Sequence, residues 1–269
     1  MRAALLEDIG HGHDLTTEAI VPLQRRARAK MVARAPGVVA GIDGALLAFE
    51  LLDESVETAV CVADGERVAA GETIAEISGS ARAILTAERT GLNLLCHLSG
   101  IATATARLVD LVAGTNARIA DTRKTTPGLR ALEKYAVRCG GGTNHRFGLD
   151  DAVLIKDNHL ALAGSIRAAV AAVRARTGHM VKVEIEVDTL EQLREALDEP
   201  IDAVLLDNMT PAELAQAVAM TAGRVLLEAS GGVSAGTVVE IARTGVDLIS
   251  VGALTHSAAA LDVGLDLDA

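Results

Sequence analysis

Basic side chains gather in one short region of an otherwise acidic chain. The 269 residues hold 25 Lys or Arg against 36 Asp or Glu, a formal charge of −11 at pH 7. Between Arg118 and Lys156, by contrast, eight Lys or Arg stand against four Asp or Glu. A local positive region inside a repelling field suits a small, strongly anionic ligand, because a polyanion would meet the surrounding negative charge first. The charge pattern predicts a pocket for such a ligand and argues against nucleic acid as a partner.

The residues that can do chemistry stand at the ends of six short apolar runs. The runs are ARIADTRK, DAVLIKDN, MVKVEIEVD, DAVLLDN, RVLLEASGG and VDLISVGAL, each followed by an amphipathic stretch. Arg123 and Lys124 end the first run, Lys156 the second, and Glu186 and Asp207 the next two. Such repeats indicate βα units, in which the carboxyl ends of parallel strands converge on one face. We therefore expect these side chains to meet in one site.

The chemistry open to this set is the binding of anions and of a hard cation. Its lysines and arginines, joined by Arg146, supply charge for carboxylates and phosphates, and guanidinium groups suit bidentate carboxylate binding. Glu186 and Asp207 offer oxygen donors that suit either a divalent ion such as Mg²⁺ or ribose hydroxyls. The structural alternative is that these carboxylates only pair with Lys156.

Two glycine-containing turns are candidates for holding a phosphate group. Ser230, Gly231 and Gly232 stand between a strand and a helix, and Gly252 recurs one unit later. Small residues let backbone N–H groups approach a phosphate at a helix N-terminus. The alternative is plain turns with a helix cap. The glycines before His145, in GGGTN, likewise indicate either a helix C-cap or a close approach to a ligand.

Other polar groups have a structural interpretation. The histidines of HGHD lie two residues apart without further ligands nearby, so we expect no metal there. Asp14, ahead of LTTE, is typical of a helix N-cap. Arg130, Lys134 and Arg138 recur at helical spacing and predict a solvated helix face.

Two kinds of element must position the site. Residues 28–79 alternate apolar and polar residues in short runs broken by glycines, which predicts a small β-rich domain. Residues 86–113 keep apolar positions on a 3.6-residue period and predict one long or kinked helix that leads into the βα repeats. Six visible strands, with room for a seventh, favour a barrel smaller than the eight-stranded form. An open doubly wound sheet is the alternative, and it would spread the polar residues along an edge.

Composition excludes several classes of protein. With no Trp, one Tyr and two Phe, the chain lacks the aromatic residues that stack on bases. Its three cysteines lie far apart, which indicates neither a disulfide framework nor a zinc site. The N-terminal sequence meets an acidic residue at Glu7, and no apolar run approaches the ~20 residues of a membrane span. We expect a cytoplasmic protein with no membrane partner.

The order of these motifs resembles the quinolinate phosphoribosyltransferase family. The matching motifs are TRKTTPGLRALEKYAVRCGGGTNHRFGL, IKDNH, EIEVD, LLDN, SGG and VGALTHS. The resemblance runs from EDIGHGHDLTT almost to the C-terminus. Six motifs in one order and at one spacing make chance agreement implausible.

The resemblance implies a type II phosphoribosyltransferase of the α/β class. An N-terminal α/β domain, hammerhead-like, would span residues 1–100, and an incomplete seven-stranded α/β barrel would span residues 101–256. The tail at 257–269 would pack on the N-terminal domain. The family pattern further implies a homodimer or a higher oligomer, with Arg89 reaching into the partner's site.

The resemblance also implies roles for individual residues. The implied substrate-binding residues are Arg89, Thr122, Arg123, Lys124, His145, Arg146, Lys156, Glu186, Asp207, Ser230, Gly231, Gly232, Gly252 and Ala253. Catalytic roles would fall to Lys124, Lys156, Glu186 and Asp207. The last two would also bind Mg²⁺, mostly through substrate and water.

The implied activity transfers the phosphoribosyl group of phosphoribosyl pyrophosphate to quinolinate with loss of CO₂, giving nicotinate mononucleotide and pyrophosphate in de novo NAD biosynthesis. Two carboxylates and several phosphates would account for the cationic region. Three alternatives share parts of this pattern. The paralogue associated with molybdenum transport diverges at the IKDNH motif, which is intact here. A Schiff-base aldolase would use Lys156, and a phosphate-ligand sensor would bind without turnover.

Overall fold

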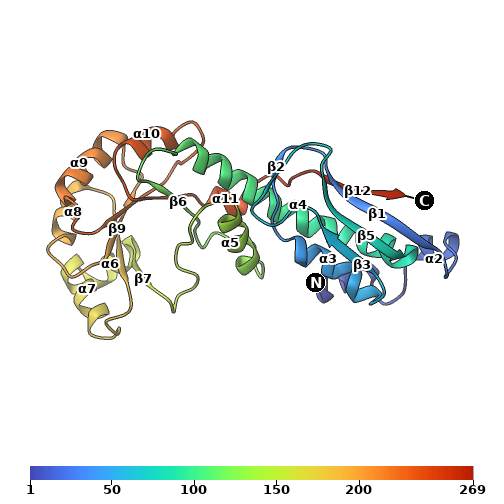
Figure 1. The fold of residues 1–269 in the computed structure, drawn as a ribbon. Helices are drawn as coiled ribbons and strands as arrows, with labels where there is room; N and C mark the ends of the chain where they lie inside the picture. Colours follow the sequence, from blue (N-terminus) through green and yellow to red (C-terminus); the bar gives the residue numbers. More distant parts are fainter. Residues whose placement is uncertain (269) are drawn as a thin grey trace. The chain divides into compact units, whose positions relative to one another are not determined.

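Two units of structure share the chain, and the first is assembled from three separate segments. The computed structural model describes residues 1–268. Unit 1 comprises residues 1–106, 127–141 and the segment from Ser257 onward, and unit 2 comprises residues 107–126 and 142–256. Figure 1 shows the course of the chain through both units. The sequence-based boundaries at residues 100 and 256 stay a prediction about separate domains.

An antiparallel sheet in the order β12-β1-β5-β3 forms the centre of unit 1. Its strands are β1 (Arg26–Ala33), β3 (Glu57–Val60), β5 (Thr73–Ser80) and β12 (Val263–Asp268), and a second pair joins β2 (Gly37–Val38) to β4 (Arg67–Val68). Along β1, Ala29, Met31 and Ala33 are buried, whereas Arg28 and Lys30 are exposed. This alternation of period two leaves one sheet face for the core and one for solvent. The β-rich N-terminal region predicted from the sequence is confirmed.

The helices of unit 1 supply the rest of its core. They are α1 (Arg2–Ile9), α2 (Leu15–Ile20), α3 (Ile42–Leu52), α4 (Ala81–Leu111) and α5 (Arg130–Cys139), and α4 continues into the first residues of unit 2. Phe49 of α3 and Ile84, Leu92 and Leu95 of α4 are buried in one apolar cluster with the sheet. Asp14 caps α2 as expected, since its carboxylate accepts the Thr17 N–H at 2.9 Å.

Helix α4 confirms the long helix predicted from the apolar period. Its 31 residues are long and apolar enough to cross a membrane by length and composition. However, 56% of its most apolar window is buried inside the structure, as in the core helix of a folded domain. Burial against the sheet accounts for its apolar residues.

Helix α5 corrects one expectation. Lys134 is only 2% exposed, and the adjacent Glu133 is fully buried with its Oε1 2.9 Å from His97 Nε2. The predicted solvated face of Arg130, Lys134 and Arg138 is therefore wrong for Lys134, although Arg138 is exposed. Helical spacing of charges does not reveal which face packs, and here α5 turns Lys134 inward together with Ala136 and Val137.

Unit 2 is built of alternating strands and helices around a parallel sheet in the order β6-β11-β10-β9-β8-β7. Its strands are β6 (Arg118–Ala120), β7 (Val153–Ile155), β8 (Val183–Val187), β9 (Ala203–Asp207), β10 (Leu226–Ser230) and β11 (Leu248–Ser250). Its helices are α6 (Asp157–Ala163), α7 (Ile166–Arg174), α8 (Leu190–Ala196), α9 (Pro211–Thr221), α10 (Val238–Arg243) and α11 (Ala253–His256). Each of the six runs selected from the sequence forms one of these strands.

The sheet is a barrel that is interrupted between β6 and β7. The first strand, β6, pairs with the last, β11, and among residues 1–268 no ladder joins β6 to β7. The sheet thus has six strands, not the seven expected. In the gap, Thr143 forms an isolated parallel bridge with Ala120. The Asp121 carboxylate accepts hydrogen bonds from the next residues, Asn144 and His145, and so holds this segment beside the end of β6.

Side-chain alternation along the strands directs polar groups into the barrel. In β8, Val183, Ile185 and Val187 are buried, while Glu184 and Glu186 lie on the opposite face. The apolar residues meet the surrounding helices, which hold the strand in register. The glutamates are left to face the interior, so the barrel fold itself delivers charge to the site.

Candidate functional site

Two adjoining hollows lie at the carboxyl ends of the unit 2 strands. The first, of about 430 Å³, is lined by Thr122, Arg123, Lys124, His145, Arg146, Leu154, Lys156, Glu186, Leu205, Asp207, Glu228, Ser230 and Ser250. The second, of about 400 Å³, is lined by Thr122, Lys124, Asp207, Asn208, Ser230, Gly231, Gly232, Val233, Ser250, Val251, Gly252, Ala253 and His256. Five residues line both, so the two hollows form one continuous site.

The structure brings together nearly all of the residues predicted from the sequence. Nine of the fourteen line the first hollow, and Gly231, Gly232, Gly252 and Ala253 line the second. Arg89 differs, because it lies exposed on α4 in unit 1 and lines neither hollow. The convergence of strand ends expected of a barrel is thus observed, while the roles of the residues stay predictions.

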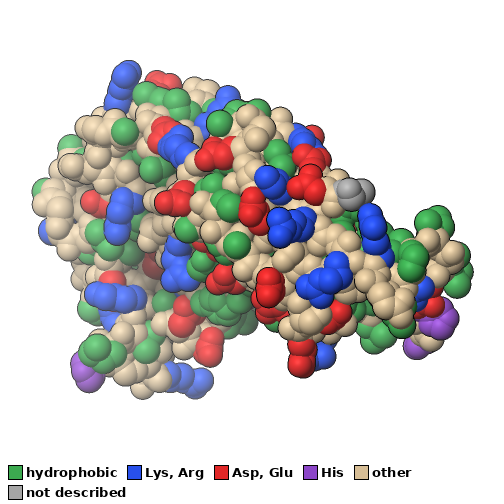
Figure 2. All heavy atoms as spheres, turned by 45° about the vertical axis from the view of Figure 1, so that its right-hand side comes forward, with side chains coloured by type: hydrophobic (Ala, Val, Ile, Leu, Met, Phe, Trp, Pro, Cys, Tyr) green, Lys and Arg blue, Asp and Glu red, His purple; other side chains and the backbone are tan. Residues whose placement is uncertain are grey.

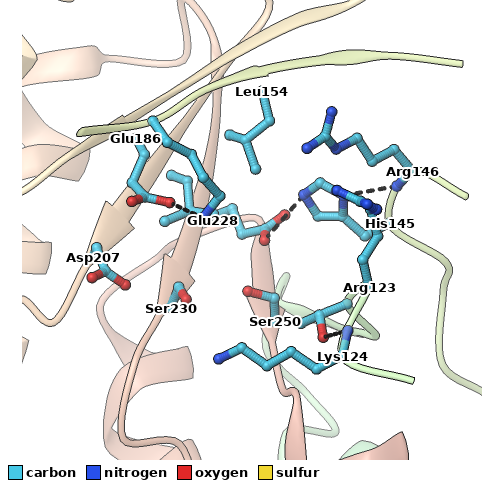
Figure 3. Close-up of a pocket in the computed structure, with 13 residues that line it drawn as sticks. Arg123, Lys124, His145, Arg146, Leu154, Glu186, Asp207, Glu228, Ser230 and Ser250 are labelled. Atoms are coloured by element: carbon cyan, nitrogen blue, oxygen red, sulfur yellow. Dashed lines mark hydrogen bonds and ion pairs between the residues drawn. The ribbon is translucent and has the colours of Figure 1, made fainter. Parts of the chain in front are cut away.

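One side of the first hollow is cationic. Figure 3 shows Arg123, His145 and Arg146 together, across the hollow from Glu186 and Asp207. Arg123 Nε is buried and has no hydrogen-bond partner among the described residues. The Arg146 guanidinium donates to the Ala152 carbonyl at 3.1 Å. Burial, and then the charge of Arg123, lower the pKa of Arg146. Two adjacent, partly buried guanidinium groups are costly unless an anion joins them.

The opposite side contains acids with polar partners. Lys156 Nζ lies 2.7 Å from Glu186 Oε2, and the Lys156 side chain is 46% exposed. Asp207 Oδ2 accepts a hydrogen bond from the Asn208 amide at 2.6 Å. The alternative in which Glu186 serves as the ion-pair partner of Lys156 therefore has a basis in the geometry. Each carboxylate nevertheless lines the hollow.

The second hollow is shaped by glycines. Gly231 has a φ of 97°, and a Cβ there would lie 2.1 Å from Asn208 Oδ1. At Gly252 a Cβ would lie 2.8 Å from Lys124 Cδ. Lys124 is held further by Thr255, whose hydroxyl donates to its carbonyl at 2.7 Å. Glycine is thus favoured at Gly231 by its positive φ, whereas at Gly252 a larger residue would require the Lys124 side chain to move.

A buried acidic group lies beside His145. His145 Nε2 is 2.9 Å from Glu184 Oε2 and 3.5 Å from Glu228 Oε1. Glu228 is 2% exposed, and its Oε1 accepts no hydrogen bond within the described chain. Burial, and then the charge of Glu184, raise the pKa of Glu228 to about 7, while His145 and Ser250 lower it. One ligand atom from each of the three residues lies within 4.8 Å of the others, a spacing at which they could hold a metal ion.

Comparison with known proteins identifies the family to which this chain belongs. The family models for the N-terminal and C-terminal domains of quinolinate phosphoribosyl transferase match residues 14–99 and 101–266. The chain belongs to the quinolinate phosphoribosyltransferase family. It is accordingly a phosphoribosyltransferase for quinolinate in NAD biosynthesis, as predicted from the six motifs.

Relatives of this phosphoribosyltransferase family match along nearly the whole chain. The carboxylating nicotinate-nucleotide pyrophosphorylase of Mycobacterium leprae is 51% identical, covering 99% of this chain and 95% of that protein. The probable enzyme of that name from Bacillus subtilis is 46% identical over 97% of this chain and 90% of its own length. The crystal structure of NadC from Streptococcus pyogenes superimposes with a TM-score of 0.96 at 42% identity, covering 99% of this chain and 94% of that one. The family, the fold class and the enzyme activity predicted from the sequence are confirmed, whereas the cytoplasmic location stays a prediction.

Sequence reasoning on this phosphoribosyltransferase missed three buried acids near the site. Glu184 and Glu228 lie two residues before Glu186 and Ser230 on the same strands, so the period of two alone places them on the pocket side. Asp121 is fully buried and accepts hydrogen bonds from the Asn144 amide at 2.5 Å and the His145 N–H at 2.9 Å. Its only signal was a position at the end of the first run.

Proposed function

We propose that the first hollow binds the two carboxylates of quinolinate. Arg123 and Arg146 carry the proposal, because neither guanidinium forms an ion pair with a carboxylate among the described residues and both line the hollow. The charges of Asp151 and Glu184 act on Arg146 only from beyond ion-pair distance. A dicarboxylate would supply the missing negative charge, and a guanidinium can bind a carboxylate through two N–H groups. Thr122, His145 and Lys156 line the same hollow and complete the subsite.

The second hollow then receives the 5-phosphate of phosphoribosyl pyrophosphate. Ser230, Gly231, Gly232, Gly252 and Ala253 surround it with main-chain groups and little side-chain bulk. Lys124 lines both hollows and can therefore bind negatively charged groups of the ligand where the two hollows meet. Glu186 and Asp207 are suited to the ribose hydroxyls, since carboxylates accept hydrogen bonds from hydroxyls.

Glu186 and Asp207 also fit the Mg²⁺ that pyrophosphate chemistry implies. Both are carboxylates at the mouth of the first hollow, and Mg²⁺ is usually bound through one or two carboxylates together with substrate phosphates. When bound there, the ion would stabilise the negative charge that develops on pyrophosphate. The group of His145, Glu184 and Glu228 fits a cation less well. His145 Nδ1 accepts the Arg146 N–H at 2.7 Å, so Nε2 carries the ring proton and has no lone pair for a metal.

The chemistry follows from what these residues hold. Lys124 and Lys156 stabilise the leaving pyrophosphate as C1 of the ribose gains positive charge. The pyridine nitrogen attacks C1 while the bond from C1 to the pyrophosphate oxygen breaks. The resulting pyridinium accepts the electron pair released when the 2-carboxylate leaves as CO₂, and C2 then takes a proton. No step needs a covalent bond to Lys156, unlike the aldolase alternative.

Comparing two substrates tests the dicarboxylate subsite. With Mg²⁺ and phosphoribosyl pyrophosphate, we expect quinolinate to release pyrophosphate and CO₂. We expect nicotinate to be at least about tenfold poorer in kcat/KM, because one arginine would remain uncompensated. Pyrophosphate release is measured for both under the same conditions. Equal turnover of the two acids would contradict the proposal, and ligand binding without release would favour the sensor alternative.

We further propose a homodimer in which Arg89 completes the site of the partner subunit. The support is the family resemblance at Arg89, together with the exposure of its side chain, 65%, on α4. Arg89→Ala subunits and Lys156→Ala subunits are each expected to be inactive. After exchange in an equal mixture, half of the dimers pair one of each, and each such pair rebuilds one intact site. Activity should recover to about a quarter of wild type, and recovery near zero after exchange confirmed by mass would contradict the arrangement.

A further inference from the structure

Glu184 is an acid beside the first hollow to which the reaction proposed above gives no role. It lies on β8 with 12% of its side chain exposed, and its Oε2 is 2.9 Å from His145 Nε2. Glu186, two residues on, points to the same side of the strand and lines the mouth of the site. Glu184 therefore lies about one strand repeat, roughly 7 Å, deeper in the barrel.

His145 has its two ring nitrogens engaged on opposite sides. Nδ1 accepts the main-chain N–H of Arg146 at 2.7 Å and so carries no proton. The proton of the neutral ring is then on Nε2, which points to Glu184. The ring thus links a carboxylate below the pocket to the backbone of the arginine beside it. Figure 3 shows this ring between Glu228 and Arg146.

This link keeps the glutamates and the arginines apart. The guanidinium groups of Arg123 and Arg146 form no ion pair with a carboxylate among the described residues, although the charges of Glu184 and Asp151 act on Arg146 from farther away. His145 supplies the hydrogen-bond donor for Glu184. The neutral ring leaves the charge of both guanidinium groups for a ligand, which direct arginine–glutamate pairs would cancel.

We propose that Glu184 is a positioning residue for the quinolinate subsite. It fixes the orientation and tautomer of His145, and through the Nδ1 contact it fixes the main chain, and with it the guanidinium, of Arg146. The proposal rests on the function proposed above for Arg146. Glu184 itself touches neither substrate nor reacting atoms.

Two variants of Glu184 separate the hydrogen bond from the charge. Glu184→Gln keeps the reach and an accepting oxygen but removes the charge. Glu184→Asp keeps the charge but is one methylene shorter and cannot reach Nε2. We expect Glu184→Asp to raise KM for quinolinate about tenfold, with KM for phosphoribosyl pyrophosphate within about twofold, whereas Glu184→Gln stays within about threefold on both. The reverse order, or an equal rise in both KM values, would overturn the proposal.

The tautomer of His145 gives a readout that does not depend on activity. The ¹⁵N chemical shifts of its ring nitrogens, assigned by their loss in His145→Gln, should show a protonated Nε2 in the wild type and in Glu184→Gln. A mixture of tautomers is expected in Glu184→Asp. An unchanged tautomer in Glu184→Asp together with an unchanged KM would show that Glu184 has no positioning role.

Two controls distinguish failure of this proposal from failure of the proposed function. Asp202→Asn alters another carboxylate that holds β8, through the Val183 N–H, and should lower stability without separating the two KM values. The double variant Arg146→Ala with Glu184→Asp should be no worse than Arg146→Ala within about twofold, since Glu184 acts through Arg146. If Arg146→Ala itself left KM for quinolinate unchanged, the proposed function of Arg146 would be wrong and this inference with it. If Arg146→Ala raised KM for quinolinate while Glu184→Asp kept the wild-type KM, this inference alone would be overturned.

Discussion

The two ends of the unit 2 strands treat charge in opposite ways. At the amino ends, Asp202 accepts hydrogen bonds from Arg174 and Lys182 at 2.9 and 2.7 Å and from the Val183 N–H. Burial alone would raise the pKa of Asp202, but these bonds outweigh it and lower the pKa to about 2. At the carboxyl ends, Lys156 pairs with Glu186, but Arg123 and Arg146 form no ion pair with a carboxylate among the described residues.

This difference shows how one scaffold separates stability from binding. Paired charges at the amino ends connect the start of β8 to the start of β9. They stabilise the folded state and involve no ligand. Uncompensated charges at the carboxyl ends cost stability, which the ligand restores when it binds. Figure 2 shows basic and acidic side chains closely interspersed on the visible surface, whereas Figure 3 shows Arg123 and Arg146 on the opposite side of the hollow from Glu186 and Asp207.

The strongest way to break the comparison is to remove a cation from the carboxyl end. Lys156→Ala and Arg146→Ala should each lower kcat/KM on the order of 10²-fold or more, at least ~2.7 kcal/mol of transition-state stabilisation, with the fold intact. Steady-state kinetics and circular dichroism measure the two effects. Arg194→Ala, on the exposed side of α8, is the matched control and should leave kcat/KM unchanged. If all three variants behaved alike, the carboxyl-end cations would have no special role.

A second test uses the acid with the raised pKa. The pKa of Glu228 is about 7 when folded and 4.5 ordinarily, so the folded state binds the proton more tightly. Its contribution to stability is complete below pH 4.5 and is lost as pH rises through 7. Relative to Glu228→Gln, the wild-type free energy of unfolding should fall by about 2 kcal/mol across this window. Denaturant unfolding at pH 5 and pH 8 measures it, and parallel curves for the two proteins would contradict the assignment.

The smallest expected effect concerns the amino ends of the strands, where Asp202 contributes to stability and not to binding. Because the pKa of Asp202 is lowered to about 2, its contribution is present above pH 3.8 and lost as pH falls through 2. Asp202→Asn should cost about 1 kcal/mol at pH 7, since water screens part of the interaction, and the cost should vanish near pH 2. Kinetic constants should not change. A loss of activity without a loss of stability would mean that the amino end also serves the reaction.

The sequence revealed most of the site because strand ends carry their own signal. Apolar runs that end in Lys156, Glu186 or Asp207 indicate both the strand and the side on which its last residue acts. The same signal could not reveal Asp121 as a hydrogen-bonding anchor, because its partners Asn144 and His145 lie beyond an intervening helix. The segment that Asp121 holds beside β6 forms only the isolated Ala120–Thr143 bridge and no strand, so the strand count was also out of reach.

Charge spacing on a single helix proved a poorer guide than strand ends. Lys134 shares its spacing with exposed Arg138, yet it is buried, since the face of α5 that packs is decided by the rest of unit 1. Glu184 was missed for a different reason. Its period-two relation to Glu186 was visible in EIEVD and its preceding residues, but only the geometry shows that it meets His145.

The pairing of β12 with β1 has a consequence for folding during synthesis on the ribosome. Arg28 lies opposite Asp268 in this ladder, 240 positions further along the chain, so β1 gains this neighbour only after residues 142–256 of unit 2 have been made. At ~5–20 residues per second, that interval is roughly 10–50 s. During it, unit 2 can be synthesised in full, while β1 presents an open edge to solvent or to another nascent chain. A chaperone that shields this edge during synthesis would raise the yield of folded enzyme without changing the stability of the finished molecule.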